Sequence, residues 1–262
     1  SVAGVTIGFE AGLWEGIIGN DASCLVCHDG VTAPAYFETW AETAHADFFT
    51  RAIEGAVSSH YSGGCISCHT VGYDEDADNN GFDDVADGLG WVFPALLQPG
   101  NWDLVPAEVQ QLANIQCENC HGPNDNPGAI GQEFYKMTMN SGMCGQCHDA
   151  LTHHTRNDEW LRAGHSNLHL AVEEATVQHR GATAGHCGRC HSGNGYVAYS
   201  KQLLEGTSGN ILCVTAGNPT PHGCSNGDPE DIDYLSGLGL NEERVEPVTC
   251  AACHDPHAHD NP

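Results

Sequence analysis

The pentapeptide Cys-x-x-Cys-His occurs six times in these 262 residues. Two thiols at this spacing can add across the two vinyl groups of one porphyrin, and the histidine that follows can bind its iron. The motifs predict twelve haem-attachment residues: Cys24, Cys27, Cys65, Cys68, Cys117, Cys120, Cys144, Cys147, Cys187, Cys190, Cys250 and Cys253. They also predict six proximal iron ligands: His28, His69, His121, His148, His191 and His254. We therefore expect a c-type cytochrome with six haem c groups.

Tetrahedral zinc is the alternative use of paired cysteines, because six such pairs could build three four-cysteine sites. A zinc site needs no histidine directly after the second cysteine, yet a histidine follows all six pairs. The pattern therefore favours haem over zinc.

The chain offers little polypeptide for each predicted haem, with 262 residues for six groups or about 44 residues per haem. The porphyrins themselves must then form most of the core. The 32 glycines and 12 prolines suit a chain that turns often around flat cofactors. We expect a fold that is mostly coil with short α-helices, wrapped around a chain of haems.

An internal repeat relates the first and fourth motifs. Eleven residues separate His28 from Trp40, and the same number separates His148 from Trp160. Each tryptophan is followed by four residues and a histidine, in a W-x4-H pattern. Agreement at several fixed offsets indicates two tandem three-haem modules.

The repeat sets the predicted domain boundaries. An N-terminal segment, residues 1–23, precedes the first module at residues 24–130 and the second at residues 131–262. The N-terminal segment is rich in glycine and apolar residues and carries no motif. It is predicted either to contact a neighbouring subunit or to cover the first haem.

Three segments are predicted to be helical. Residues 34–58 carry apolar or small residues at spacings of three and four. Their counterpart is expected to begin at Asn157 or Asp158, either of which suits a helix N-cap, and to run to residue 178. Pro106 opens a third helix, which is predicted to end at the Cys117 motif.

A histidine on each face of a haem closes the iron to substrate and leaves an electron carrier. The repeat matches four histidines in pairs, and we expect all four to be second axial ligands: His45, His165, His60 and His179. For one of these pairs the alternative is hydrogen bonding to haem propionates.

For the two remaining haems we expect His154 and His257 to be the second ligands, and a ligand from a neighbouring subunit is the alternative. The other candidates are His153, His169, His186, His222 and His259. The three methionines, at 137, 139 and 143, are expected to pack against porphyrin faces rather than bind iron.

Residues 76–87 fit the calcium-loop pattern D-x-[DN]-x-[DN]-G-x5-[acid]. The predicted ligands are Asp76, Asp78, Asn80, the carbonyl of Phe82, and Asp87, which stands where such loops usually carry glutamate. A solvated acidic turn is the alternative in a chain of this charge.

The chain carries 35 acidic and 8 basic residues, for a formal charge of −27. Such a charge disfavours nucleic acid and anionic membranes as partners. No apolar run approaches the ~20 residues of a membrane span, so we expect no membrane insertion.

Two cysteines remain outside the motifs, Cys213 and Cys224, and we expect a disulfide between them in an oxidising compartment. Because haem c is attached after export, we interpret Ser1 as a mature N-terminus and expect an exported protein, extracellular or alternatively periplasmic.

Several runs resemble known multihaem cytochromes. W-x4-H, CISCHTVGY at 65–73 and CENCHGP at 117–123 resemble the tetrahaem cytochromes that accept electrons during hydroxylamine oxidation in nitrifiers. HHT at 153–155 and CHDPH at 253–257 are similar to extracellular cytochromes of metal-respiring bacteria, some of which polymerise into haem-lined filaments. Family members commonly keep a histidine shortly after CENCHGP. Residues 124–131 contain none, so the resemblance points to His154 as ligand of that haem.

These features predict a protein that carries electrons along bis-histidine haems in extracellular or periplasmic respiration, polymerised as a conductive filament. Its partners would be redox proteins, extracellular electron acceptors and further copies of the chain. A monomeric periplasmic shuttle is the first alternative. A multihaem reductase of nitrogen or sulfur oxyanions is the second, and it is disfavoured because no Cys-x-x-Cys-Lys motif occurs. We therefore expect an electron-transfer protein and not an enzyme.

Overall fold

The computed structural model describes residues 12–18, 24–25, 27–123, 139–149, 154–204 and 229–258. These residues form short helices joined by turns, and the longest helix has 12 residues. Within the described ranges there is no β-strand, only an isolated bridge between Thr70 and Ala113. The prediction of a mostly coil chain with short helices is confirmed. The predicted disulfide of Cys213 and Cys224 lies outside the described residues.

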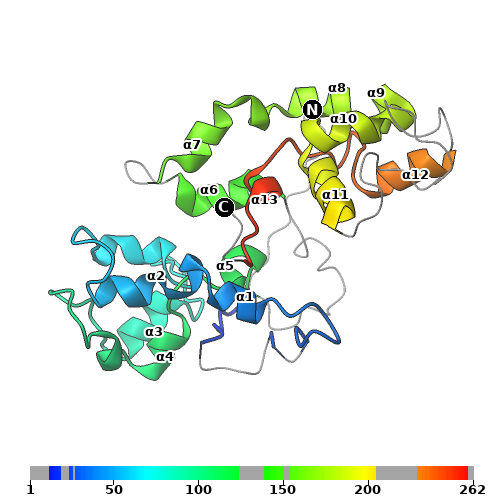
Figure 1. Cartoon of the computed structure of the whole chain (residues 1–262). Coiled ribbons are helices and arrows are strands. Elements are labelled where there is room, and N and C mark those ends of the chain that lie inside the picture. Colours follow the sequence, from blue (N-terminus) through cyan, green and yellow to red (C-terminus); the bar gives the residue numbers. More distant parts are fainter. Residues whose placement is uncertain are drawn as a thin grey trace. The chain divides into compact units, whose positions relative to one another are not determined.

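The chain divides into two compact units (Figure 1). Unit 1 comprises residues 1–137 with 256–260, and unit 2 comprises residues 138–255 with 261–262. The helices of unit 1 are α1 (Phe37–Ala41), α2 (Ala44–Ile53), η1 (Gly63–Cys68), α3 (Phe82–Gly88), η2 (Trp102–Leu104), α4 (Ala107–Gln111) and α5 (Cys117–His121). Those of unit 2 are α6 (Ser141–His148), α7 (Arg156–Leu161), η4 (Gly164–Ser166), α8 (Leu168–Ala175), α9 (Val177–Arg180), η5 (Gly181–Thr183), α10 (Ala184–His191), α11 (Gly193–Leu204), α12 (Pro229–Gly237) and α13 (Cys250–Cys253).

The apolar core of unit 1 lies where α2, α3 and α4 meet, in the blue to green part of Figure 1. Phe49 of α2 and Phe82 of α3 are fully buried and meet edge to face, with ring centroids 5.4 Å apart. Val109 of α4 is fully buried in the same cluster. This core fixes the segments between the second and third motifs.

Helix α2 ends at a glycine in the left-handed region. Gly55 has a φ of 74°, which favours glycine over residues with a side chain. Its N–H donates to the carbonyl of Ala52, and the Ala56 N–H donates to the carbonyl of Arg51. These two bonds are the Schellman arrangement that satisfies the last carbonyls of a helix.

The continuous helix predicted over residues 34–58 is wrong, because α1 and α2 are separated by a turn. Thr43 is extended there, with a ψ of 159°. Both its N–H and its Oγ1 donate to the Trp40 carbonyl, at 2.8 and 2.7 Å. A threonine that bonds the local backbone in this way competes with the helical hydrogen bonds.

The other two helix predictions fail for similar local reasons. In unit 2 the predicted long helix is divided into α7, η4, α8 and α9, and Ala163 is extended in the position equivalent to Thr43. The helix predicted from Pro106 to the Cys117 motif stops at Gln111. Asn114 then takes a φ of 68°, which ends any helical path.

Unit 2 has a smaller apolar core. Leu235 of α12, Leu240 just after this helix and Ala184 of α10 are fully buried and pack in one cluster. A second group joins Ala171 of α8 to Val245. The backbone around Leu240 is held to α9, because the Val177 N–H donates to the Leu240 carbonyl at 3.0 Å.

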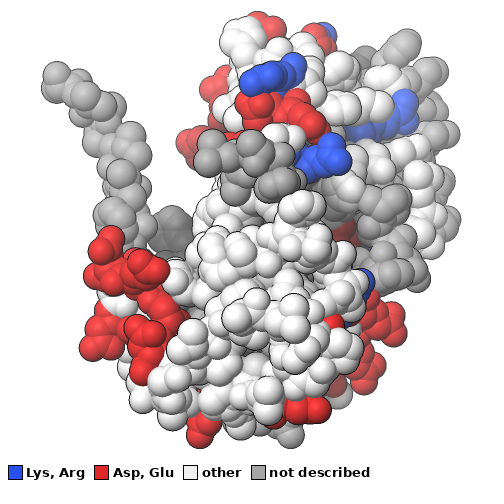
Figure 2. Space-filling model, turned by 90° about the vertical axis from the view of Figure 1, so that its left-hand side faces the viewer, with Lys and Arg blue, Asp and Glu red and all other residues white. Residues whose placement is uncertain are grey.

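The face drawn in Figure 2 carries several groups of acidic side chains, and the fewer basic side chains lie mostly in the upper part of the view. This matches the excess of acidic over basic residues in the chain. No helix in the described ranges combines the length and the apolar composition that crossing a membrane requires.

Candidate functional site

All six Cys-x-x-Cys-His motifs lie on single helical turns. In the first, the N–H of Cys27 and of His28 both donate to the Cys24 carbonyl, at 3.3 and 2.9 Å. The second to sixth lie in or directly at η1, α5, α6, α10 and α13. Residues three apart in a helical turn lie on one face, so each turn presents both sulfurs to the same side. Each of the twelve cysteines is at least partly exposed as a residue.

Two of the motif histidines have a hydrogen-bond partner at Nδ1. The Nδ1 of His28 lies 2.9 Å from the carbonyl oxygen of Pro34. Because a carbonyl only accepts, Nδ1 must carry the proton and Nε2 is left with the lone pair that binds a metal. The Nδ1 of His69 lies 3.2 Å from the hydroxyl of Tyr61, which can also accept.

In each unit one motif histidine has a second imidazole nearby, with the ring planes at 17° for His121 and His257 and at 89° for His148 and His154. In unit 1 the ring centroids of His121 and His257 lie 6.1 Å apart, and in unit 2 those of His148 and His154 lie 6.0 Å apart. Two metal–imidazole bonds of about 2 Å, plus about 1 Å from each nitrogen to its ring centre, give roughly 6 Å between centroids. Each pair joins the histidine of a motif to a histidine outside the motifs.

The predicted ligand His154 therefore faces the fourth motif, whereas the resemblance assigns it to the haem at Cys117. The histidine that the structure brings to the Cys117 motif is His257. In unit 2, burial first and then the nearby His154 lower the pKa of His148. A lowered pKa favours the neutral imidazole, which is the form that ligates metals.

The four histidines matched by the repeat have other contacts. His45 lies in α2, and its carbonyl accepts the N–H of Ile115 at 3.0 Å. His60 Nδ1 lies 3.3 Å from the Ser58 hydroxyl. His179 Nε2 lies 3.1 Å from a carboxylate oxygen of Glu242. His165 lies in η4. Their assignment as axial ligands stays a prediction.

The remaining candidates are placed as follows. His169 Nδ1 lies 3.5 Å from the Glu173 carboxylate, and His186 lies in α10. The Met143 sulfur accepts a hydrogen bond from the Gln146 amide at 3.7 Å. The others lie outside the described residues: His153, His222, His259 and Met137.

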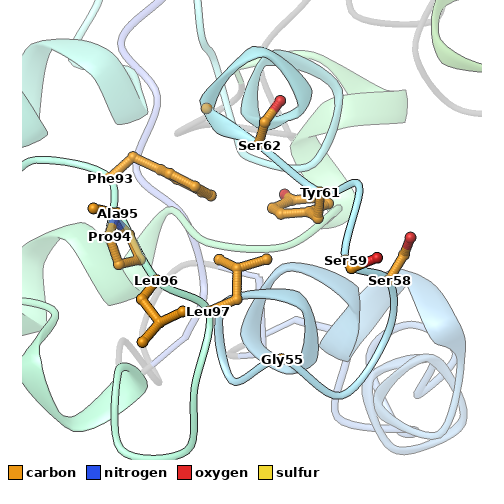
Figure 3. A pocket seen from close by; sticks show the side chains of 11 residues that line it. Gly55, Ser58, Ser59, Tyr61, Ser62, Phe93, Pro94, Ala95, Leu96 and Leu97 are labelled. Carbon is orange, nitrogen blue, oxygen red and sulfur yellow. The ribbon is translucent and has the colours of Figure 1, made fainter.

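A pocket of about 530 Å³ opens beside the second motif (Figure 3). The rings of Tyr61 and Phe93 extend toward each other, with centroids 6.0 Å apart, and Leu97 lies below them in the view. Tyr61 also stacks on His69, with centroids 5.4 Å apart and planes at 16°. The lining combines these aromatic and aliphatic side chains with Ser58, Ser59 and Ser62, and it ends at Gly63, two residues before Cys65.

Burial raises the pKa of Tyr61, and the adjacent Cys65 and Cys68 raise it further. In the same unit, the thiols of Cys24 and Cys117 are hydrogen-bonded to each other, and this contact followed by burial raises the pKa of Cys117. The first and third motifs thus bring their leading sulfurs together.

The predicted calcium loop serves as a contact for the N-terminal segment. The amide of Asn80 donates to the Trp14 carbonyl at 2.6 Å, and the Trp14 N–H donates to the Asn79 carbonyl at 3.0 Å. Asn80 has a φ of 61°, and α3 begins two residues later at Phe82. Within the described ranges, no three His, Cys, Asp or Glu residues lie together as a metal site. Calcium binding stays a prediction.

Residues 12–18 also hold the third motif, a role that no sequence signal indicated. The side chain of Glu118, inside Cys-Glu-Asn-Cys-His, is buried and accepts the N–H of Gly16 at 2.8 Å and of Glu15 at 3.2 Å. Gln116 accepts the N–H of Ile17 at 2.6 Å. These bonds join the segment to α5 within unit 1.

Comparisons with protein families, with curated proteins and with solved structures gave no match.

Proposed function

We propose that this protein is a six-haem c-type cytochrome that carries electrons between redox partners. The two histidine pairs carry the proposal. Each brings two imidazoles to a centroid separation that two ligands of one iron would have, and one imidazole of each pair belongs to a Cys-x-x-Cys-His motif. A zinc site built from four cysteines would give no reason for this arrangement.

The residues of each motif would have separate roles. The two cysteines would hold a porphyrin by thioether bonds, and the histidine would bind the iron from one side. The haem would supply reversible one-electron chemistry. The second histidine, His257 for the third motif and His154 for the fourth, would close the other side and leave no coordination position for a substrate.

Several features outside the pairs support haem attachment. The twelve motif cysteines are partly or fully exposed as residues. The Nδ1 of His28 bonds the Pro34 carbonyl, which leaves Nε2 for iron. The pocket beside Tyr61 and Phe93 would receive an edge of the second haem.

The cellular setting follows from the attachment chemistry. We propose that the protein is exported, acts outside the cytoplasm and assembles with further copies of itself into a filament of haems. The charge of −27 would oppose self-association unless salt or a divalent cation screens it.

The deciding experiment is expression of the chain in an oxidising compartment with a haem-attachment system. Mass spectrometry of the intact product and a pyridine haemochrome assay should give six covalent haems per chain. Electron paramagnetic resonance of the oxidised protein should show low-spin haems only. The same sample is then imaged by electron cryo-microscopy.

Each result has a defined meaning. Fewer than six haems, or zinc bound in their place, would overturn the assignment of the motifs. A strong high-spin ferric signal would overturn the closed, bis-histidine state and favour a reductase. Single particles at moderate salt, with or without calcium, would overturn the proposed filament. They would be consistent with electron transfer by a monomer.

A further inference from the structure

Two tryptophans make the same long-range contact, one in each unit. The indole N–H of Trp40 donates to the carbonyl of Ile115 at 3.1 Å, and that of Trp160 donates to the carbonyl of Val248 at 2.8 Å. The acceptors precede Cys117 and Cys250 by two residues each. Each tryptophan therefore joins the segment after the first motif of its unit to the last motif of the same unit.

In unit 1 the contact has two halves. The Ile115 N–H donates to the carbonyl of His45 at 3.0 Å, so both backbone polar groups of Ile115 are bound by the W-x4-H segment. Next to it, the Asn114 amide exchanges hydrogen bonds with Thr50 of α2, at 3.1 and 3.0 Å. Residues 114–115 are thus fixed on α1 and α2.

The residue whose carbonyl accepts the tryptophan N–H, called here the clamped residue, lies six positions before the histidine of the last motif in both units. It is Ile115 before His121 and Val248 before His254. A short helical turn connects the two, α5 in unit 1 and α13 in unit 2. A shift of the clamped residue is therefore transmitted to the histidine. In unit 1 this shift would change the 6.1 Å separation between His121 and His257.

We propose that Trp40 and Trp160 are positioning residues that set the axial geometry of the third and the sixth haem, respectively. The inference rests on the proposed function, because the two haems whose geometry the tryptophans would set are themselves predicted from the motifs. Each acts through a backbone carbonyl and does not touch the haem iron.

A purely packing role would look different in a substitution test. Trp40 is 7 % exposed, so its ring contributes to stability whether or not the N–H bond matters. Phenylalanine keeps most of the apolar ring and removes the donor. It leaves a partly buried carbonyl without that partner, so the segment that carries the carbonyl is no longer held by this bond.

The test compares W40F and W160F with W91F as the control. Trp91 packs against Phe49 and Phe82 in the core of unit 1 and belongs to no motif. Haem content, electron paramagnetic resonance and a redox titration are measured on each holoprotein. We expect all variants to keep six haems. The g-values and midpoint of one haem should change in W40F, and those of a different haem should change in W160F.

W91F should lower stability and leave all six low-spin signals as in the wild type. The proposal is overturned if W40F and W160F have wild-type signals, or if W91F changes the same signal as W40F. Because the two tryptophans lie in different units, failure of one variant to accumulate leaves the other as a full test. Absence of haem from the wild type itself would instead overturn the proposed function.

Discussion

The rings of Tyr36 and His257 stack with their centroids 4.5 Å apart and their planes at 23°. The other neighbour of the Tyr36 ring is His28, at 6.3 Å between centroids. Tyr36 thus lies between the proximal histidine of the first motif and the histidine that faces the third motif, 6.1 Å from His121. This contact holds His257 in place from the side.

Replacing Tyr36 with leucine should weaken the hold on His257. An aromatic pair contributes about 1 kcal/mol beyond its buried area, so the balance between bound and released His257 should shift roughly fivefold. We expect a new high-spin ferric signal from one haem, and binding of added imidazole should remove it. Y36F is the control, because it keeps the ring. An equal high-spin signal in Y36F and Y36L would contradict the stacking role.

The pairing of His154 with the fourth motif can be tested by combining substitutions. H154A should leave one haem five-coordinate, seen as a high-spin ferric signal. In a chain that lacks the fourth haem through C144S and C147S, H154A should add no new signal. In a chain that lacks the third haem through C117S and C120S, H154A should still produce the high-spin ferric signal.

The reverse pattern would show that His154 serves the third haem, as the family resemblance implies. H169A is the control, because His169 is exposed and contacts Glu173. It should keep every low-spin signal of the wild type.

The Glu118 carboxylate should contribute measurably to the stability of unit 1. It is 6 % exposed and accepts backbone N–H groups of Glu15 and Gly16. E118A removes both carboxylate oxygens, so the N–H groups of Glu15 and Gly16 both lose their acceptor. We expect a loss of about 1–3 kcal/mol in the free energy of unfolding, measured by chemical denaturation. E38Q, on the exposed surface of α1, should change it by less than about 0.5 kcal/mol.

Glu54 should make the stability of unit 1 depend on pH. Its carboxylate accepts the N–H of Trp102 at 2.6 Å and of Gly100 at 2.9 Å, and these bonds lower its pKa from the usual 4.5. The folded state therefore binds the Glu54 proton less tightly than the unfolded state. The stabilisation is present above pH 4.5 and is lost as the pH falls through the lowered, folded-state pKa.

Thermal unfolding of wild type and E54Q at several pH values measures this effect. The wild type should be more stable than E54Q at neutral pH, and the difference should shrink in acid. E42Q, which changes an exposed carboxylate, should follow the wild type. A difference between wild type and E54Q that stays constant down to strongly acidic pH would contradict the role of the carboxylate.

Local features of the fold were predictable because they depend on neighbouring residues. The short helices and the lack of strands in the described ranges follow from a chain rich in glycine and proline. The breaks at Thr43 and Ala163 were not predicted, because apolar spacing alone continues through both positions. Thr43 breaks the helix through its bonds to the Trp40 carbonyl. The helix propensity of threonine does not predict whether its side chain will bond the local backbone in this way.

The sequence by itself determined the six motifs and the W-x4-H repeat, because each is a contiguous pattern whose chemistry follows from its spacing. Only the tertiary structure decided which histidine faces which motif. His121 and His257 are more than 130 residues apart, and no periodicity links them. Their meeting depends on the path of the whole chain, which returns residues 256–258 to unit 1 after building unit 2. The same holds for Trp40 and Ile115, whose contact comes from the packing of α1 and α2 against residues 114–115.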